Sequence, residues 1–386
     1  MDNRVQNQLA INITTKNNQV ENVAIKSSRI TNAADIFVGK KVDEVLSLLP
    51  LLFSVCGKAQ QTASLQAIEN FYHLPDDPKI QQYRNSSVKM ESIREHLHRI
   101  FISWADFIKT PQDIKSMQQI MQLQHKFQEV LTTDIYKISP KTINIDKSKI
   151  KDLQIELEQH LTQNIFKIRP DEWLQIKNIQ DLQNWADNTN TIAAKMIKFI
   201  IDKKYQNIGS SSTPPLTAIN QKIIKEIIHN KDYIKNPTID NECYESTSCT
   251  IIKTELLSAI SKEHGKSMLH RAVATLTQIA SNNENLFNNN NDDDGDKKDL
   301  KIYKNHGIGT IIAARGKLVH CIKIKDDEIK NYKILAPTEW NFHPQGSLQK
   351  MLIGLKGDKK ELKKIINMLI CLLDPCVDYE LNFKEI

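Results

Sequence analysis

Two short cysteine segments near opposite ends of this 386-residue chain most constrain its fold. Cys56 lies in SVCGKAQ (residues 54–60), and Cys376 lies 320 positions later in DPCVDYE (residues 374–380). Each segment reads as short and irregular and lies beside an apolar stretch with helical periodicity. The two thiols can therefore meet only inside a folded core that joins both ends of the chain. We interpret the pair as a metal-binding site with two thiolate ligands.

Hydrophobic periodicity predicts a mostly helical α+β fold with small β-hairpins towards both ends. Residues 8–30 alternate apolar and polar side chains around a polar turn, which predicts one hairpin. The same pattern with a turn at Asp326-Asp327 predicts a second hairpin over 317–335. Between and after the hairpins, apolar residues recur at helical spacing over 42–49, 59–67, 93–104, 148–206, 217–230, 251–281, 348–355 and 362–373.

Breaks in these patterns suggest how the chain is divided. A Gly-, Ser- and Pro-rich linker at 209–216 is expected to join an N-terminal half (1–208) to a C-terminal half (217–386). Residues 282–296 are rich in Asn and Asp and predict a disordered surface loop. Pro50 is expected to interrupt the first helix, and residues 336–341 are expected to be irregular.

Composition and charge exclude several classes of protein. The net charge of +6 is spread over the chain without a compact basic run, so no nucleic-acid partner is expected. The start of the chain does not resemble a signal peptide, and the longest apolar run, 45–56, is too short to span a bilayer. Six cysteines without a CxxC pair favour free thiols in the reducing cytoplasm.

Four motifs, two of which contain these cysteines, resemble a known family in their order along the chain. They are CGKA at 56–59, AARG at 313–316, APTEWNFHPQG at 336–346 and DPCVDY at 374–379. Together with ESIREHL at 91–97 they resemble the large subunit of nickel–iron hydrogenases, and more closely its degenerate relatives, the HupK/HoxV-type hydrogenase maturation proteins. The resemblance spans residues 36–380 and implies a nickel–iron hydrogenase large-subunit-like fold.

The chain departs from the catalytic pattern at the metal-bridging positions. In the catalytic family each cysteine motif supplies one terminal nickel ligand and one thiolate that bridges nickel and iron. Here Cys56 and Cys376 correspond to the terminal ligands, whereas Ala59 and Tyr379 stand at the bridging positions. Alanine cannot ligate a metal, and a tyrosine hydroxyl is a poor substitute for a soft thiolate. The resemblance therefore implies a non-catalytic protein, and bound nickel is not expected.

The cyanide-binding positions of the family look retained. In the catalytic family an arginine and a hydroxyl residue donate hydrogen bonds to the cyanides of the iron, and Arg315 and Thr338 match them here. The resemblance thus implies a scaffold on which the Fe(CN)2CO fragment is assembled or held transiently. Its implied partners are a hydrogenase large subunit and the iron-cyanide assembly factors with their small chaperone.

Simpler interpretations stay open for each residue. Cys56 is alternatively an inert buried cysteine, and Cys376 part of a loop that caps a helix. Arg315 is alternatively a surface residue at the start of a strand, and Thr338 the cap of a turn. At the level of the whole chain, the alternatives are a nickel-dependent hydrogenase large subunit with unusual ligands and a metal-free interaction protein in the same pathway.

Overall fold

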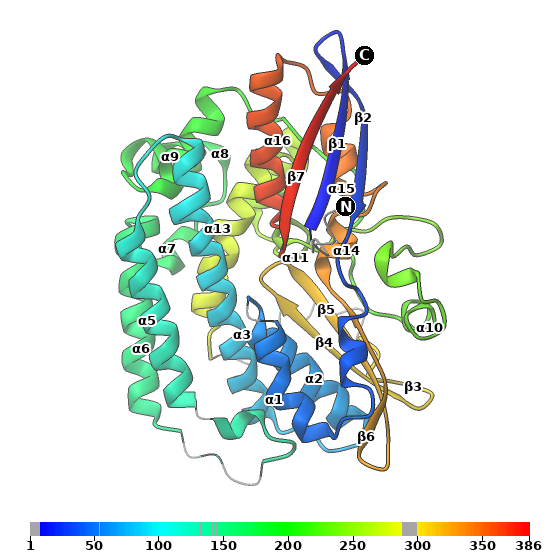
Figure 1. Ribbon diagram of the computed structural model, residues 1–386. Coiled ribbons are helices and arrows are strands. Elements are labelled where there is room, and N and C mark those ends of the chain that lie inside the picture. Colours follow the sequence, from blue (N-terminus) through cyan, green and yellow to red (C-terminus); the bar gives the residue numbers. More distant parts are fainter. Residues whose placement is uncertain (1–7, 54, 132, 141–142, 144, 288–298) are drawn as a thin grey trace.

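The computed structural model describes residues 8–53, 55–131, 133–140, 143, 145–287 and 299–386. Helices form one side of the molecule and two small sheets form the other (Figure 1). The α-helices are α1 (Val42–Leu52), α2 (Gly57–Phe71), α3 (Pro78–His98), α4 (Ala105–Phe107), α5 (Ile114–Leu131), α6 (Lys147–Leu161), α7 (Pro170–Leu174), α8 (Ile179–Asn188), α9 (Ile192–Asp202), α10 (Gln221–His229), α11 (Ser248–Ile251), α12 (Glu255–His264), α13 (Met268–Glu284), α14 (Pro337–Asn341), α15 (Ser347–Leu352) and α16 (Lys359–Leu373). Shorter helical turns are η1 (Ala33–Phe37), η2 (Arg99–Trp104), η3 (Thr133–Tyr136), η4 (Thr162–Phe166) and η5 (Tyr233–Lys235).

The first sheet joins the two ends of the described chain. Strands β1 (Gln8–Lys16) and β2 (Gln19–Ser27) form the predicted antiparallel hairpin. Strand β7 (Asp378–Glu385) lies beside β1 and runs parallel to it, so the sheet order is β2-β1-β7 (Figure 1). The segment 374–380 was expected to be irregular, and this expectation was wrong from Asp378 onward, where β7 begins. Its pairing partner lies about 370 positions away, as in Gln8↔Asp378, where local periodicity gives no signal.

The second sheet packs helices on both of its faces. Its order is β3 (Ile302–Tyr303), β4 (His306–Ala313), β5 (Gly316–Lys325) and β6 (Glu328–Leu335), with β5 and β6 forming the predicted hairpin. Leu318 and Ile322 face the cluster around α1 and α2, whereas Val319 and Cys321 face the cluster around α10. The helix α2 approaches β4 so closely that a Cβ atom on Gly309 would lie 1.9 Å from the carbonyl oxygen of Ala63. This contact fixes α2, and the cysteine before it, against the sheet.

The expected linker does not separate two cores. One hydrophobic cluster contains residues of both predicted halves, such as Leu97 of α3, Val273 of α13 and Leu369 of α16. Within the linker, Ser211 and Thr213 are buried, and their hydroxyl oxygens lie 2.9 Å apart. The two halves therefore share one core, because the connection packs against it.

Three local expectations were also wrong. Helix α1 continues through Pro50. Proline has no N–H to donate to the Leu46 carbonyl oxygen, and Gln61 Nε2 donates to that oxygen instead (3.3 Å). Residues 337–341 form the short helix α14, with Pro337 in its first turn. Residues 282–287, the start of the expected surface loop, are ordered against α3: Leu286 is buried and Asn282 Nδ2 donates to Ser92 Oγ (3.1 Å). The rest of that expected loop, 288–296, lies outside the described residues.

Among the described residues, every helix is too short or too polar to cross a membrane.

Candidate metal centre

Cys56 and Cys376 lie in one region, each at the end of a helix. Cys56 is half-buried and stands directly before α2, while Cys376 is half-buried and follows the end of α16. Asp374 turns the chain there with a left-handed φ of +55°, a conformation that Asp tolerates better than most residues. Burial, with smaller contributions from nearby Glu91 and Cys376, raises the pKa of the Cys56 thiol to about 12. The metal-free thiol thus keeps its proton at neutral pH, and a bound metal ion has to displace it.

The other two predicted residues lie beside the cysteines. The Thr338 hydroxyl donates to Cys376 Sγ at 3.2 Å. Arg315, in the turn between β4 and β5, is only 7% exposed, so the structure does not support a surface position for it. Its charge acts on both Cys56 and Cys376. The structure therefore brings together all four residues singled out in the sequence, while their role in metal binding stays a prediction.

Two carboxylates hold Arg315 in place. Its Nη2 donates to Glu95 Oε2 (2.8 Å), and its Nε lies 3.2 Å from Asp374 Oδ2. Arg99 ties the same segment to η2, since its Nε donates to Asp374 Oδ1 (2.5 Å) and its Nη2 to the Pro375 carbonyl oxygen (3.0 Å). Although burial opposes ionisation, Asp374 and Glu95 keep the pKa of Arg315 above its usual value. The guanidinium therefore stays cationic in the core.

A second arginine, the half-buried Arg29, approaches from the end of the N-terminal hairpin. Arg29 Nη1 lies 2.9 Å from Glu339 Oε1, and the Arg29 charge acts on both Cys56 and Cys376. Burial raises the pKa of Glu339, although Arg29 opposes this. Two guanidinium groups therefore lie near the two thiols, an arrangement suited to anionic ligands.

Glu91 on α3 fixes the start of α2 after Cys56. Its carboxylate accepts hydrogen bonds from the backbone nitrogens of Lys58 (2.8 Å) and Ala59 (3.1 Å), two donors that have no partner within the helix. Burial raises the pKa of Glu91 from 4.5 to about 7. Near neutral pH the Glu91 carboxyl group is therefore protonated in some molecules and ionised in the others.

Glu91→Gln is expected to change how stability depends on pH. Because the folded protein binds the Glu91 proton more tightly than the unfolded chain does, this group stabilises the fold most at low pH. That contribution is lost as the pH rises from 4.5 to about 7. The slope is at most about 1.4 kcal/mol per pH unit, and the glutamine variant should lack it. Urea unfolding across this range measures it, with Glu156→Gln on the exposed surface as the control; equal slopes for wild type and Glu91→Gln would contradict the assignment.

Several buried polar atoms around the thiols have no hydrogen-bond partner. They include Arg29 Nη1, Arg315 Nε, Glu339 Oε2 and Asp374 Oδ2, although the ion pairs described above bring them near opposite charges. Within the described part of the chain, no group of three or more His, Cys, Asp or Glu side chains is placed to hold a metal ion. Two thiols beside two guanidinium groups thus suit an iron fragment that arrives with its own anionic ligands better than they suit a bare ion.

The two positions that lack a bridging cysteine are also engaged elsewhere. Ala59 is fully buried, and its nitrogen bonds to Glu91. The Tyr379 hydroxyl donates to Asn367 Oδ1 on α16 (2.9 Å), and burial raises the Tyr379 pKa to about 12. Neither residue supplies a third ligand in this arrangement.

Comparisons with known proteins bear on the family and the fold. Residues 207–378 match the family model described as nickel-dependent hydrogenase. The Ni-Fe-Se hydrogenase of D. vulgaris Hildenborough superposes with a TM-score of 0.66 over 94% of both chains, at 15% sequence identity. The fold is therefore that of a nickel–iron hydrogenase large subunit.

Sequence matches over almost the whole chain include proteins that carry a different name. The hydrogenase expression/formation protein HupV of Azotobacter chroococcum mcd 1 is 21% identical over 90% of both chains. HoxV of Cupriavidus necator, also named a hydrogenase expression/formation protein, is 22% identical over 97% of this chain and 95% of its own. This chain is a relative of the HupK/HoxV-type proteins. By contrast, the uptake hydrogenase large subunit of Rubrivivax gelatinosus matches only 18% of this chain, at 36% identity.

The HupK/HoxV-type resemblance did not reveal all residues of the centre. Arg29, Glu95 and Glu339 were not singled out in the sequence, because charged residues are usually solvent-exposed. One signal was available: Glu91 and Glu95 are four residues apart on a helix otherwise expected to pack, so they share one face. Arg29 offered no such signal, since only the tertiary fold brings it to Cys56.

Proposed function

We propose that this protein is a non-catalytic scaffold for assembly of the Fe(CN)2CO part of a nickel–iron hydrogenase active site. The observation that supports it most is the pairing of two half-buried thiols with the buried guanidinium of Arg315 and the half-buried one of Arg29, at a place where Ala59 and Tyr379 replace the bridging cysteines. Relatives named hydrogenase expression/formation proteins support a role in maturation.

Each residue has a distinct task in this proposal. Cys56 and Cys376 bind iron as thiolates, which suit a soft low-spin metal. Arg29 and Arg315 donate to the cyanide ligands, and the Thr338 hydroxyl, 3.2 Å from Cys376 Sγ, is free to turn from sulfur to ligand. Two protein ligands hold the fragment less firmly than four would, which favours its transfer to the hydrogenase large subunit. The donors of the fragment would be the iron-cyanide assembly factors with their small chaperone.

Anaerobic purification tests the proposal directly. Protein produced together with the iron-cyanide assembly factors should contain iron and show infrared bands of metal-bound carbon monoxide and cyanide. The double variant Cys56→Ala, Cys376→Ala should lose both the iron and the bands. Cys321→Ala, which removes a buried thiol on the far face of β5, should keep them. Wild-type protein without these bands, in cells whose hydrogenase matures normally, would overturn the proposal.

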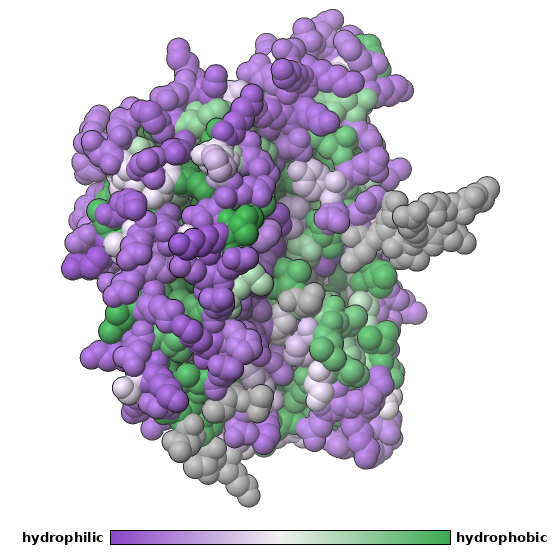
Figure 2. Space-filling model, turned by 60° about the vertical axis from the view of Figure 1, so that its left-hand side comes forward, coloured by the Kyte–Doolittle hydropathy of each residue, from purple (hydrophilic) through white to green (hydrophobic). Residues whose placement is uncertain are grey.

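One observation favours a metal-free docking role as the second candidate. Leu51 is 77% exposed, and Leu52 and Val55 are also exposed next to Cys56. Figure 2 shows hydrophobic residues gathered at the lower right, over α1, whereas the surface of α5 and α6 is mostly hydrophilic. Exposed apolar patches often mark protein contacts. If docking alone were the function, the double cysteine variant would still support hydrogenase maturation, whereas the scaffold proposal requires that it fail.

A further inference from the structure

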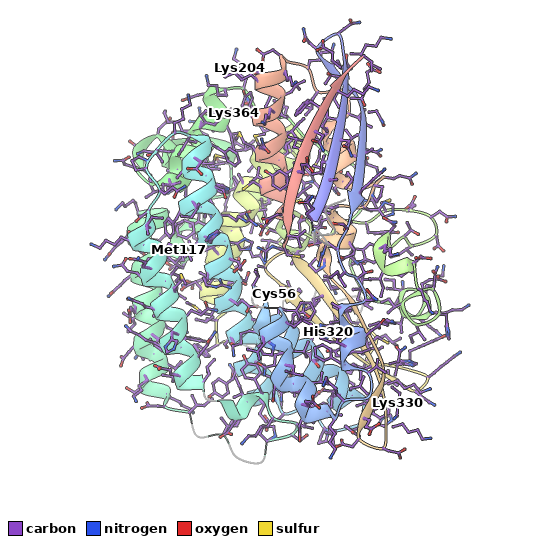
Figure 3. The ribbon with its side chains drawn as sticks, in the orientation of Figure 1. Cys56, Met117, Lys204, His320, Lys330 and Lys364 are labelled. Atoms are coloured by element: carbon purple, nitrogen blue, oxygen red, sulfur yellow. The ribbon has the colours of Figure 1, made fainter. Side chains whose placement is uncertain are left out.

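A buried chain of hydrogen bonds leads away from the sulfur of Cys56. Gln60 Nε2 lies 3.6 Å from Cys56 Sγ, and Gln60 Oε1 lies 2.8 Å from His320 Nε2. The other ring nitrogen of His320, Nδ1, lies 2.8 Å from the Tyr332 hydroxyl. The chain thus crosses from α2 to β5 and β6, and Figure 3 shows Cys56 and His320 where α2 meets this sheet.

These three polar side chains are almost completely enclosed. Gln60 is 3% exposed, and His320 and Tyr332 are both at 0%. Burial lowers the pKa of His320 to about 3, so its ring is neutral and carries one proton. Apolar residues would fill this space at lower cost, because each buried polar group has to find a partner. Since this polar chain ends at a proposed metal ligand, its side chains are expected to have a role other than filling the core.

The order of the protons along the chain follows from the contacts. Since Gln60 turns its amide oxygen towards His320 Nε2, that nitrogen carries the ring proton and donates it. Nδ1 of His320 is then an acceptor, so the Tyr332 hydroxyl donates to it. The Gln60 amide N–H consequently points at Cys56 Sγ. The reverse order would set the amide oxygen against the sulfur. A protonated Cys56 thiol is only a weak donor to that oxygen, and a metal-bound thiolate cannot donate to it at all.

We propose that Gln60, His320 and Tyr332 are positioning residues that keep an amide N–H directed at the sulfur of Cys56. A donor at a metal-bound thiolate withdraws electron density from sulfur and weakens its donation to the metal. In the metal-free protein Cys376 receives a comparable donor from the Thr338 hydroxyl. The proposal rests on the proposed function in treating Cys56 as a metal ligand, but the proton order can be measured without metal.

Nitrogen NMR of metal-free protein labelled with 15N-histidine tests the proton order. The His320 signals, assigned by their absence in His320→Gln, should report a neutral ring protonated at Nε2. Tyr332→Phe removes the donor to Nδ1 and should lower the fraction of this tautomer. Tyr233→Phe, which removes a buried hydroxyl that donates to the Thr238 carbonyl oxygen, should leave it unchanged. A His320 ring protonated at Nδ1 in the wild type would overturn the proposal.

Infrared spectroscopy of the protein that carries the iron fragment distinguishes an electronic effect of Gln60 on the metal from a purely structural role. Gln60→Leu removes the donor to sulfur, so the metal becomes more electron-rich and the carbon monoxide band should shift to lower wavenumber. Gln66→Leu is the matched control on the same helix, because the Gln66 side chain accepts from Thr310 N instead. An unshifted band in Gln60→Leu would overturn the role at the sulfur. Absence of all bands would instead count against the proposed function, and the tautomer measurement would still decide the proton order.

Discussion

Arg315→Met is expected to lower the free energy of unfolding by about 3–5 kcal/mol and to remove the infrared bands of bound cyanide. The variant leaves the buried carboxylates of Glu95 and Asp374 without the cation that lies between them. Removing this buried cation is costly, because two buried carboxylates then lie close together with only Arg99 and Arg94 left to balance their charge. Urea unfolding measures the stability, and infrared spectroscopy of the anaerobic protein measures the bands.

Two variants control for this result. Arg169→Met breaks an exposed ion pair with Asp171 and should change the stability by less than about 1 kcal/mol. Arg315→Lys keeps the charge but lacks the planar fork that contacts two carboxylates, so its loss of stability should be smaller than that of methionine. If Arg315→Met were as stable as Arg169→Met, the ion network around the thiols would not be part of the folded core.

Glu245→Ala is expected to destabilise the protein by a similar amount, about 3–5 kcal/mol, at a site outside the thiol centre. Glu245 pairs with Arg271 through two contacts, of 2.6 Å and 3.0 Å, and both side chains are almost fully buried. It also accepts from the hydroxyl groups of Ser347 and Thr247, both at 2.6 Å. Burial alone would raise the Glu245 pKa, but Arg271 and these donors hold it well below its usual range.

The dependence on pH distinguishes this pair from a simple packing defect. Because the folded-state pKa of Glu245 is depressed, its contribution is present above about pH 4.5 and is lost as the pH falls. The difference in unfolding free energy between wild type and Glu245→Ala should therefore shrink on acidification below that value. Lys126→Ala, which breaks the exposed pair with Glu156, serves as the control and should change stability by less than about 1 kcal/mol. A difference that stays constant with pH would contradict the ionic explanation.

Sequence patterns predicted local structure better than long-range pairing. The hairpins of β1 with β2 and of β5 with β6 follow from alternation around short turns, so their signal lies within one stretch of chain. The parallel pairing of β7 with β1 joins residues about 370 positions apart, and no local period reports it. The burial of residues 282–287 was missed for a related reason. Polar residues predict an exposed loop, and the hydrogen bonds that these residues make with α3 form only in the tertiary fold.

The candidate centre was predictable where a motif marks it and not elsewhere. Cys56, Cys376, Arg315 and Thr338 stand in segments that resemble a family, and the structure gathers them in one place. Arg29 and Glu339 reach the thiols through tertiary contacts alone, and a single charged residue in a sequence looks the same whether exposed or buried. The hydrogen bonds of Gln60 and His320 likewise depend on how α2 packs against β5.

The position of β7 has a consequence for biosynthesis. Translation proceeds from β1 towards β7, so the central strand of the first sheet has one open edge until β7 has been made. Cys376 immediately precedes that strand, whereas Cys56 leaves the ribosome more than 300 residues earlier. During translation the chain therefore has Cys56 but lacks Cys376. An iron fragment that needs both sulfurs can bind only after the DPC segment has been synthesised and β7 has paired with β1.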